Sequence, residues 1–295
     1  MKNVKAKTNE QIAMQVSANS IAVNLMLSIF KLIAGLMASS GAMISDAIHS
    51  ASDVFSTIIV IIGVKISGKA SDEDHPYGHD RFECVASIIL AILLGVTGVG
   101  IGLTGVQKLT AGHYDTLAVP GVLALAAAVI SIVVKEIMYW YTRNAAKKIN
   151  SGALMADAWH HRSDALSSVG SFVGIFGARM GFPMLDPLAS VVICLFVVKA
   201  AVDIFRDAIS KMTDKSCDQE TVNEMHDCIM NIQGVEGIDL LKTRSFGSKY
   251  YVDIEIKADG DKKLWEAHAI AENVHHVIEQ RFPLVKHCMV HVNPA

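Results

Sequence analysis

The sequence predicts an α-helical membrane protein with six transmembrane helices, followed by a smaller C-terminal α+β domain. Of its 295 residues, 52% are hydrophobic and only 19% are charged, whereas soluble domains carry about 25% charged residues. The charges are sparse from residue 12 to 205 and crowded from residue 206 onward. This change in composition divides the chain into a six-helix membrane domain, residues 1–209, and a C-terminal domain, residues 210–295.

Six apolar stretches are each long enough for a bilayer, whose crossing takes about 20 helical residues. They are separated by turn-forming segments and cover residues 13–38, 42–67, 82–109, 118–141, 153–180 and 185–205. Lysine and arginine residues flank them almost entirely on one side of the bilayer, which predicts that both termini face the cytoplasm of a cell inner or plasma membrane. The net charge of −3 gives no reason to expect nucleic acid as a partner.

The C-terminal residues predict the order α-β-β-α-β. Ser216 or Asp218 can cap a helix that runs to about residue 232, and a second helix covers residues 264–282. Strands are predicted over residues 238–246, 250–258 and 286–294, the first two joined by the turn "GSK". A small sheet covered by helices on one face leaves apolar surface, which favours pairing with a second copy of the chain.

Two of the apolar stretches carry patterns that bear on helix packing. Polar side chains recur at three- and four-residue steps along the first stretch, on one face of a helix: Ser17, Ser20, Asn24, Ser28 and Lys31. This stripe can line a hydrated path or hold helices together through polar contacts, and the sequence leaves both interpretations open. In the third stretch, Gly98 and Gly102 form a GxxxG pair, which indicates close packing against another helix.

The pattern D-A-x-H-x-x-S-D occurs twice in apolar surroundings, once with His49 and Asp53 and once with His160 and Asp164. Ionisable side chains near a bilayer centre cost about 2.5–3.5 kcal/mol each, so they are seldom without a function. Helical spacing places each His–Asp pair on one face of its helix. If the two helices pack together, the two imidazoles and two carboxylates suit a tetrahedral Zn²⁺. The alternative is that buried His–Asp hydrogen bonds fix the helices together.

Three neighbouring residues receive other roles. Asp46 and Asp157 lie one turn away and are expected to hold the histidines in place, whereas His161 points off the shared face and is expected to be a bystander. Protonation supplies a mechanism, because an imidazole with an ordinary pKa of about 6.5 binds metal only through a deprotonated nitrogen. A site open alternately to each side of the membrane would therefore exchange a metal ion for protons.

The two HxxxD motifs, the loop "DEDHPYGH" and the order of the C-terminal elements resemble the cation diffusion facilitator family of divalent-metal/proton antiporters. The resemblance covers nearly the whole chain. It implies a homodimer, a ferredoxin-like C-terminal domain for metal binding and dimerisation, and export of cytosolic metal driven by proton entry.

The resemblance also implies further site residues. They are the loop ligands Asp72, His75 and His79, the domain-junction charge pair of Arg81 and Asp214, and the C-terminal metal ligands Asp239, Glu255, His268 and His291. Asn293 stands where the family has an acidic residue, which points to a weaker, mononuclear or regulatory C-terminal site.

Zn²⁺ is the expected cargo and bound ion, with Cd²⁺ or Co²⁺ as related substrates. Mn²⁺ or Fe²⁺ as the main substrate is the alternative within the same class, although imidazole donors argue against Mn²⁺, which favours oxygen-rich sites. Two other classes are a membrane-anchored metal sensor and a metallohydrolase. A sensor leaves the ionisable groups of two helices unexplained, and the sequence has no HExxH motif to supply a hydrolytic base. The sequence thus predicts a transporter without enzymatic activity and without an organic cofactor.

Overall fold

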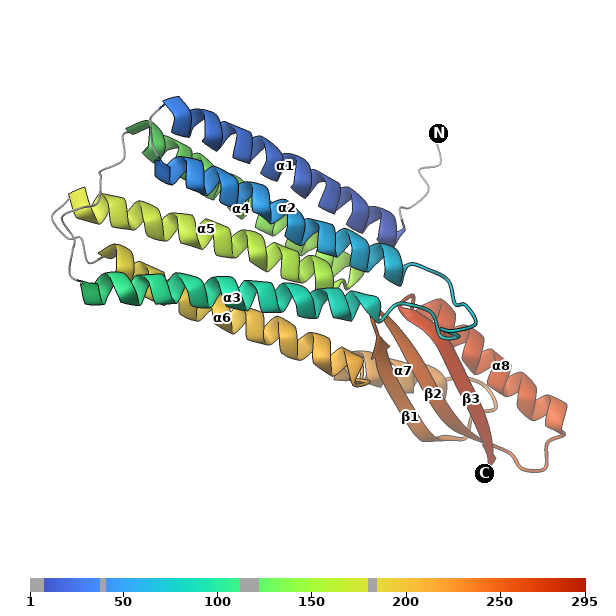
Figure 1. The fold of residues 1–295 in the computed structure, drawn as a ribbon. Helices are drawn as coiled ribbons and strands as arrows, with labels where there is room; N and C mark the ends of the chain where they lie inside the picture. The colour runs from blue at the N-terminus through green and yellow to red at the C-terminus, as the bar shows by residue number, and fades with distance from the viewer. Residues whose placement is uncertain (1–7, 38–40, 112–121, 180–184) are drawn as a thin grey trace. The chain divides into compact units, whose positions relative to one another are not determined.

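The computed structural model describes residues 8–37, 41–111, 122–179 and 185–295. The chain forms two compact units, Met1–Ala208 and Ile209–Ala295. The first is a bundle of long helices, and the second combines two helices with a three-stranded sheet (Figure 1).

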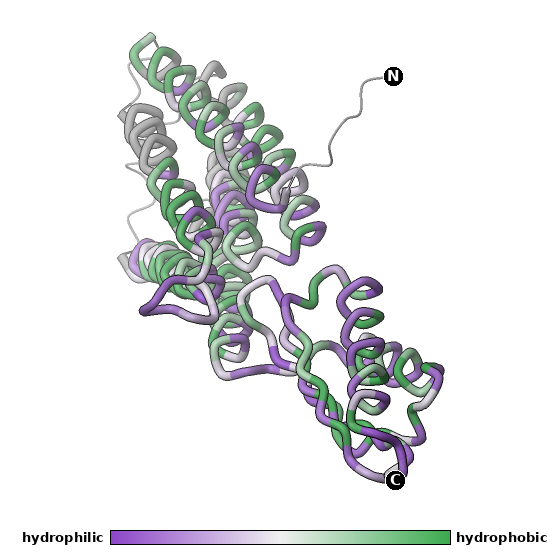
Figure 2. The backbone as a smooth tube through the Cα atoms, turned by 90° about the vertical axis from the view of Figure 1, so that its right-hand side faces the viewer, coloured by the Kyte–Doolittle hydropathy of each residue, from purple (hydrophilic) through white to green (hydrophobic). Residues whose placement is uncertain are grey.

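Six helices of 27 to 30 residues build the bundle, and each is long enough to cross a hydrocarbon layer of about 30 Å. They are α1 (Asn9–Met37), α2 (Gly41–Ser67), α3 (Phe82–Ala111), α4 (Val122–Ile149), α5 (Gly152–Arg179) and α6 (Leu185–Met212). Among the residues that the structure describes, two segments are apolar and long enough to count as candidate membrane spans on composition alone, Asn9–Ile33 and Phe82–Thr110. Apolar residues, drawn in green, predominate along the helices of this unit (Figure 2).

Small and branched apolar side chains fill the interior of the bundle. The core contains Val16 of α1, Val60 of α2, Leu90 of α3 and Leu154 of α5, all buried. Large apolar side chains such as Phe55 face outward, which suits a surface in contact with lipid. Helix α1 packs along α2 and α4, α4 packs along α5, and α3 packs against α2 and α5. The polar faces of α2, α4 and α5 therefore meet inside the bundle.

Two helices extend beyond their predicted C-terminal ends. Helix α4 runs to Ile149 instead of residue 141, and α6 runs to Met212 instead of residue 205. The predicted stretches contain the apolar residues, and a helix can continue past them because cations in its last turn face the negative end of the helix dipole. Lys147 and Lys148 occupy that turn in α4, and Asn150 ends the helix with a positive φ of 54°.

The C-terminal unit has the predicted order of elements, with α7 (Gln219–Met230), β1 (Gly237–Phe246), β2 (Lys249–Ala258), α8 (Leu264–Arg281) and β3 (Val285–Pro294). Strand β2 lies between the other two, antiparallel to β1 and parallel to β3. Asp218 caps α7 by accepting a hydrogen bond from the backbone N–H of Thr221. Gly247 supplies the positive φ, 64°, that the tight turn between β1 and β2 requires.

One face of the sheet forms the core of this unit. Val252, Ile254 and Ile256 alternate along β2 and therefore point to the same side. They pack against Ile229 of α7 and Ile278 of α8, all of them buried. Both helices thus cover the same face of the sheet, as the sequence predicts.

Candidate metal centre

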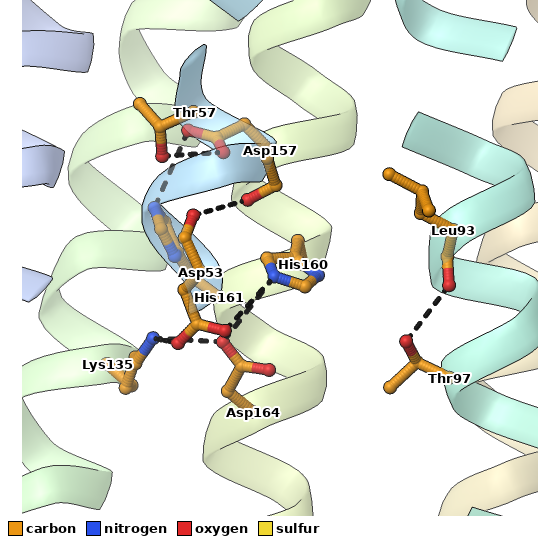
Figure 3. A network of polar contacts seen from close by, with 10 residues as sticks. Asp53, Thr57, Leu93, Thr97, Lys135, Asp157, His160, His161 and Asp164 are labelled. Carbon is orange, nitrogen blue, oxygen red and sulfur yellow. Dashed lines mark hydrogen bonds and ion pairs between the residues drawn. The ribbon is translucent and has the colours of Figure 1, made fainter. Parts of the chain in front are cut away.

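Three of the four predicted metal donors come together inside the helical bundle. Asp53 projects from α2, while His160 and Asp164 project from α5 one turn apart. The Nε2 atom of His160 lies 3.5 Å from Oδ1 of Asp53 and 4.0 Å from Oδ2 of Asp164. One donor atom from each residue lies within 4.8 Å of the others, a spacing that a single metal ion can bridge (Figure 3).

The fourth predicted donor is His49. It belongs to α2, but its side chain and that of Asp46 lie outside the described residues. His49 precedes Asp53 by about one turn of α2. Its part in the site stays a prediction.

A lysine that the sequence analysis did not include completes the described group. Lys135 of α4 donates hydrogen bonds to Oδ2 of Asp53 at 2.5 Å and to Oδ2 of Asp164 at 2.9 Å (Figure 3). Its side chain is 2% exposed, as buried as the carboxylates it contacts. The ammonium group therefore lies between the carboxylates of two different helices.

These four side chains form a charged network within an apolar bundle. Buried charges are stable only when they are paired and hydrogen-bonded, because the loss of hydration is not otherwise recovered. Asp53 and Asp164 carry two negative charges against the single positive charge of Lys135, so with a neutral His160 the group has a net charge of −1. The network is suited to attract further positive charge.

A second buried polar group is formed by Thr57, Asp157 and His161. Asp157 accepts a hydrogen bond from Thr57 at 3.3 Å, and its other oxygen lies 3.5 Å from Nε2 of His161. His161 is fully buried beside this carboxylate and is not among the three grouped metal donors, as expected from its position off the shared face. Among the described interactions the histidine that Asp157 contacts is His161, and its expected contact with His160 stays a prediction. Since α5 turns by about 100° per residue, the adjacent rings of His160 and His161 point in different directions.

The stripe on α1 is buried. Ser17, Ser20 and Asn24 are at most 2% exposed, and their side-chain polar atoms have no hydrogen-bond partner in the described part of the chain. The side-chain oxygens of Ser131 of α4 and Ser163 of α5 are also buried without a hydrogen-bond partner in the described part of the chain. Buried polar atoms in natural proteins are nearly always satisfied by a partner or by ordered water. The burial of the stripe is compatible with both predicted interpretations, a hydrated path and polar contacts between helices.

The three predicted loop residues between α2 and α3 also come together. Nδ1 of His75 lies 3.1 Å from Oδ1 of Asp72, and Nε2 of His79 lies 3.4 Å from Oδ2 of the same carboxylate. The backbone N–H of His75 also donates to Asp72, and this bond holds the pKa of the carboxyl below its usual value. Two imidazoles and one ionised carboxylate are thus grouped, with Asp72 and His75 exposed and His79 buried, and their donor atoms lie within 4.8 Å of one another.

The predicted C-terminal ligands do not gather around one point within the described chain. Asp239 is bonded to Lys257 at 3.0 Å and to the Asn293 amide at 2.9 Å, which together lower its pKa. Glu255 accepts from the same amide at 3.3 Å and lies opposite His291 in the parallel strand pairing. His268 is exposed on α8 beside Glu272. The role of these residues as metal ligands stays a prediction.

The predicted charge pair of Arg81 and Asp214 joins residues of the two compact units. Asp214 has a positive φ of 61° in the turn that follows α6. The pairing of the two side chains stays a prediction.

Lys135 is the site residue that was not predicted from the sequence, although the sequence indicates its importance. Lys135 interrupts the run "AAAVISIVV" in the fourth apolar stretch, and a lysine in such a run is costly without a partner. Helical spacing alone relates residues of the same helix, so it gave no indication that the partners of Lys135 come from α2 and α5.

Residues 17–213 match the family model of the cation efflux transmembrane domain, and residues 217–295 match that of the cation efflux protein cytoplasmic domain, named ZT_dimer. The manganese efflux system protein MneP of Bacillus subtilis is 33% identical over 98% of this chain and 98% of its own length. Metal tolerance protein C1 of Arabidopsis thaliana is 33% identical over 91% of this chain, which spans 60% of that protein. A solved MamM C-terminal domain, 22% identical, covers 26% of this chain and 94% of its own with a TM-score of 0.25, too low to support an argument.

A helical transmembrane domain followed by a small cytoplasmic α/β domain defines the molecule as a membrane transporter. The chain belongs to the cation diffusion facilitator family of cation efflux proteins. It is therefore a homodimeric membrane protein that handles divalent metal ions, and it is a transporter, not an enzyme. The predicted family, fold class and class of partner are confirmed.

Proposed function

We propose that this protein exports a divalent metal ion from the cytoplasm in exchange for protons, with Zn²⁺ as its main substrate. The observation that carries the proposal is the convergence of Asp53, His160 and Asp164 within the bundle, at distances that one ion can bridge. His49 is the fourth donor in the proposal. The ion would bind while the site is open to the cytoplasm and leave when it is open to the other side.

The donor set supports Zn²⁺. Two imidazole nitrogens and two carboxylate oxygens match the tetrahedral geometry and the borderline-soft character of this ion. The two negative charges of Asp53 and Asp164 offset the charge of the dication at membrane depth. The proposed site has no thiolate, so the ion is held less tightly than in a structural zinc site and can leave within a transport cycle.

Proton coupling follows from the same donors. A metal ion binds the imidazole through its unprotonated nitrogen, so protons and metal compete for His160. The buried polar atoms of Ser17, Ser20 and Asn24, which face the interior of the bundle, support a hydrated route by which protons reach the site. The proposed direction is export, which is supported by the match to the cation efflux family model and by the name of the efflux relative MneP.

Mn²⁺ is the second candidate substrate. Two of the three described donors are carboxylates, and oxygen donors suit Mn²⁺. The relative MneP, similar along almost its whole length, is named as a manganese efflux protein. The two substrates differ in their demand for imidazole: loss of His160 would abolish Zn²⁺ transport, whereas an aspartate at this position would retain or improve Mn²⁺ transport.

Three accessory roles complete the proposal. The loop group of Asp72, His75 and His79 binds a second ion near the cytoplasmic surface. The C-terminal ligand set binds regulatory metal across the homodimer. The charge pair of Arg81 and Asp214 joins the membrane and cytoplasmic units. With both termini in the cytoplasm, all three features lie on the side from which metal is taken up.

Purified protein in liposomes with an imposed pH gradient tests the proposal. We expect uptake of Zn²⁺ that follows the pH gradient, and Asp53→Ala should abolish it while leaving the protein folded. Thr97→Val is the matched control, because the Thr97 hydroxyl bonds only to the backbone of its own helix, at Leu93. Parallel assays with Mn²⁺, repeated on His160→Asp, separate the two substrates. Zn²⁺ and Mn²⁺ fluxes that ignore the pH gradient would refute the antiport mechanism.

A further inference from the structure

The ammonium group of Lys135 occupies the space between the two carboxylates of the proposed transport site. It approaches Oδ2 of Asp53 to 2.5 Å and Oδ2 of Asp164 to 2.9 Å, and it comes from α4, a helix that supplies none of the metal donors (Figure 3). A lysine ammonium is a compact point charge with three N–H donors and no acceptor. The Lys135 ammonium therefore occupies the position of a cation that is bound by two anionic side chains.

A metal ion and this ammonium group cannot use the same oxygen atoms together. A Zn²⁺ ion bonded to both carboxylates would lie about 2.0–2.2 Å from each oxygen, inside the space that the Lys135 ammonium now fills at 2.5 and 2.9 Å. The two cations would also repel each other strongly at such a distance in a low-dielectric interior. Binding of the metal through these two Oδ2 atoms therefore requires that the ammonium withdraw.

We propose that Lys135 is a tethered competitor of the transported ion. Its ammonium group keeps Asp53 and Asp164 paired whenever the metal is absent, and it must be displaced when the metal binds. When the ion leaves, the ammonium returns to the carboxylates and lowers the chance of rebinding. This inference rests on the proposed function of the site.

The competition also provides selectivity for divalent over monovalent ions. A divalent ion interacts with the two carboxylates about twice as strongly as a monovalent ion at the same distance. Na⁺ or K⁺ would gain no more attraction than the ammonium group that it displaces, and it would lack the advantage of being tethered. Lys135 would therefore exclude monovalent cations from the site without contacting the metal itself.

The test measures the concentration dependence of Zn²⁺ flux in liposomes, with Mn²⁺ in parallel, at fixed pH. Lys135→Met removes the charge and keeps the length of the side chain, and we expect at least about a tenfold lower KM, because two charge-assisted hydrogen bonds no longer oppose binding. The maximal rate should fall as well, because release is no longer assisted. Lys135→Arg retains the charge, so its KM should be higher than that of Lys135→Met. The exposed Lys148 of the same helix provides the control Lys148→Met, for which KM should not change.

A second readout separates competition from a merely structural role. Added Na⁺ should inhibit Zn²⁺ flux more strongly in Lys135→Met than in the wild type, because the monovalent ion no longer meets a tethered competitor. A KM that is unchanged or higher in Lys135→Met, with no new sensitivity to Na⁺, would overturn the inference.

Failure of this inference is distinguishable from failure of the proposed function. Absence of wild-type flux, or full activity of Asp53→Ala, would remove the proposed transport site itself. If Lys135→Met does not fold, the wild-type structure with bound Zn²⁺ decides: Nζ withdrawn from both carboxylates supports the inference. Nζ still hydrogen-bonded to both of them beside the ion overturns it.

Discussion

Replacing Gly102 by alanine tests how closely α3 and α6 pack, because the two helices leave no space there for a side chain. A Cβ atom at Gly102 would lie 2.4 Å from Sγ and 2.9 Å from Cβ of Cys194. One turn earlier, a Cβ atom at Gly98 would lie 2.8 Å from Cγ1 of Val197. Rotation of the Cys194 side chain can move its sulfur away, but its Cβ is fixed to the helix. The helices must therefore separate slightly.

Gly100 provides a matched control on the same helix. No atom lies within 4 Å of the Cβ position there. Overpacking costs about 1–3 kcal/mol, whereas alanine stabilises a helix interior by about 1 kcal/mol relative to glycine. The propensity gain applies to both variants, so Gly102→Ala should be about 1–3 kcal/mol less stable than Gly100→Ala. For a domain of this size, that difference corresponds to roughly 2–12 °C in the unfolding temperature.

The assay is thermal unfolding of the purified protein in detergent, followed by the loss of monodisperse protein. Cys194→Ala in the Gly102→Ala background removes the sulfur contact and should recover part of the lost stability, because neighbouring substitutions are not additive. If Gly102→Ala and Gly100→Ala unfold at the same temperature, the close approach of α3 and α6 is refuted.

Three further predictions concern the loop and the C-terminal unit. His79→Ala in an Asp53→Ala background should remove one Zn²⁺ equivalent in equilibrium dialysis, because it breaks the loop group; unchanged stoichiometry would contradict a loop site. Asp218→Ala should destabilise the C-terminal unit by about 1 kcal/mol, seen in hydrogen exchange of α7 amides. Bonds from Thr221 lower the pKa of Asp218, so this difference should be present at neutral pH and be lost as the pH falls through that lowered pKa. Burial raises the pKa of Cys288 to about 12, so its thiol should resist maleimide at neutral pH until the protein is denatured.

Local patterns in the sequence were sufficient for most of the fold. Apolar runs longer than a bilayer needs predicted all six long helices, and alternating residues such as Val252, Ile254 and Ile256 predicted the central strand. The ends of α4 and α6 were predicted too early because the predicted stretches stop with the apolar residues, whereas the helices continue. Charged residues in the last turn extend a helix beyond the membrane without breaking it.

The candidate site was predictable only where it follows from spacing along one helix. The repeated pattern D-A-x-H-x-x-S-D placed Asp53 in one helix and His160 with Asp164 in another, and the structure brings the three together. The contacts of Lys135 and of His161 with carboxylates depend on how helices face each other, which spacing within one helix does not determine. Lys135 and His161 are both ionisable residues in apolar stretches. Such a residue is expected to have a partner, but its sequence position does not show which residue the partner is.

The most direct measurement is metal-resolved density, from anomalous scattering at the zinc and manganese edges, for the full-length protein with its transported ion. We predict an ion coordinated by Asp53, His160 and Asp164, with His49 as the fourth donor. An ion bound elsewhere in the bundle, with Asp53 and Asp164 bonded only to protein groups, would contradict the proposed transport site.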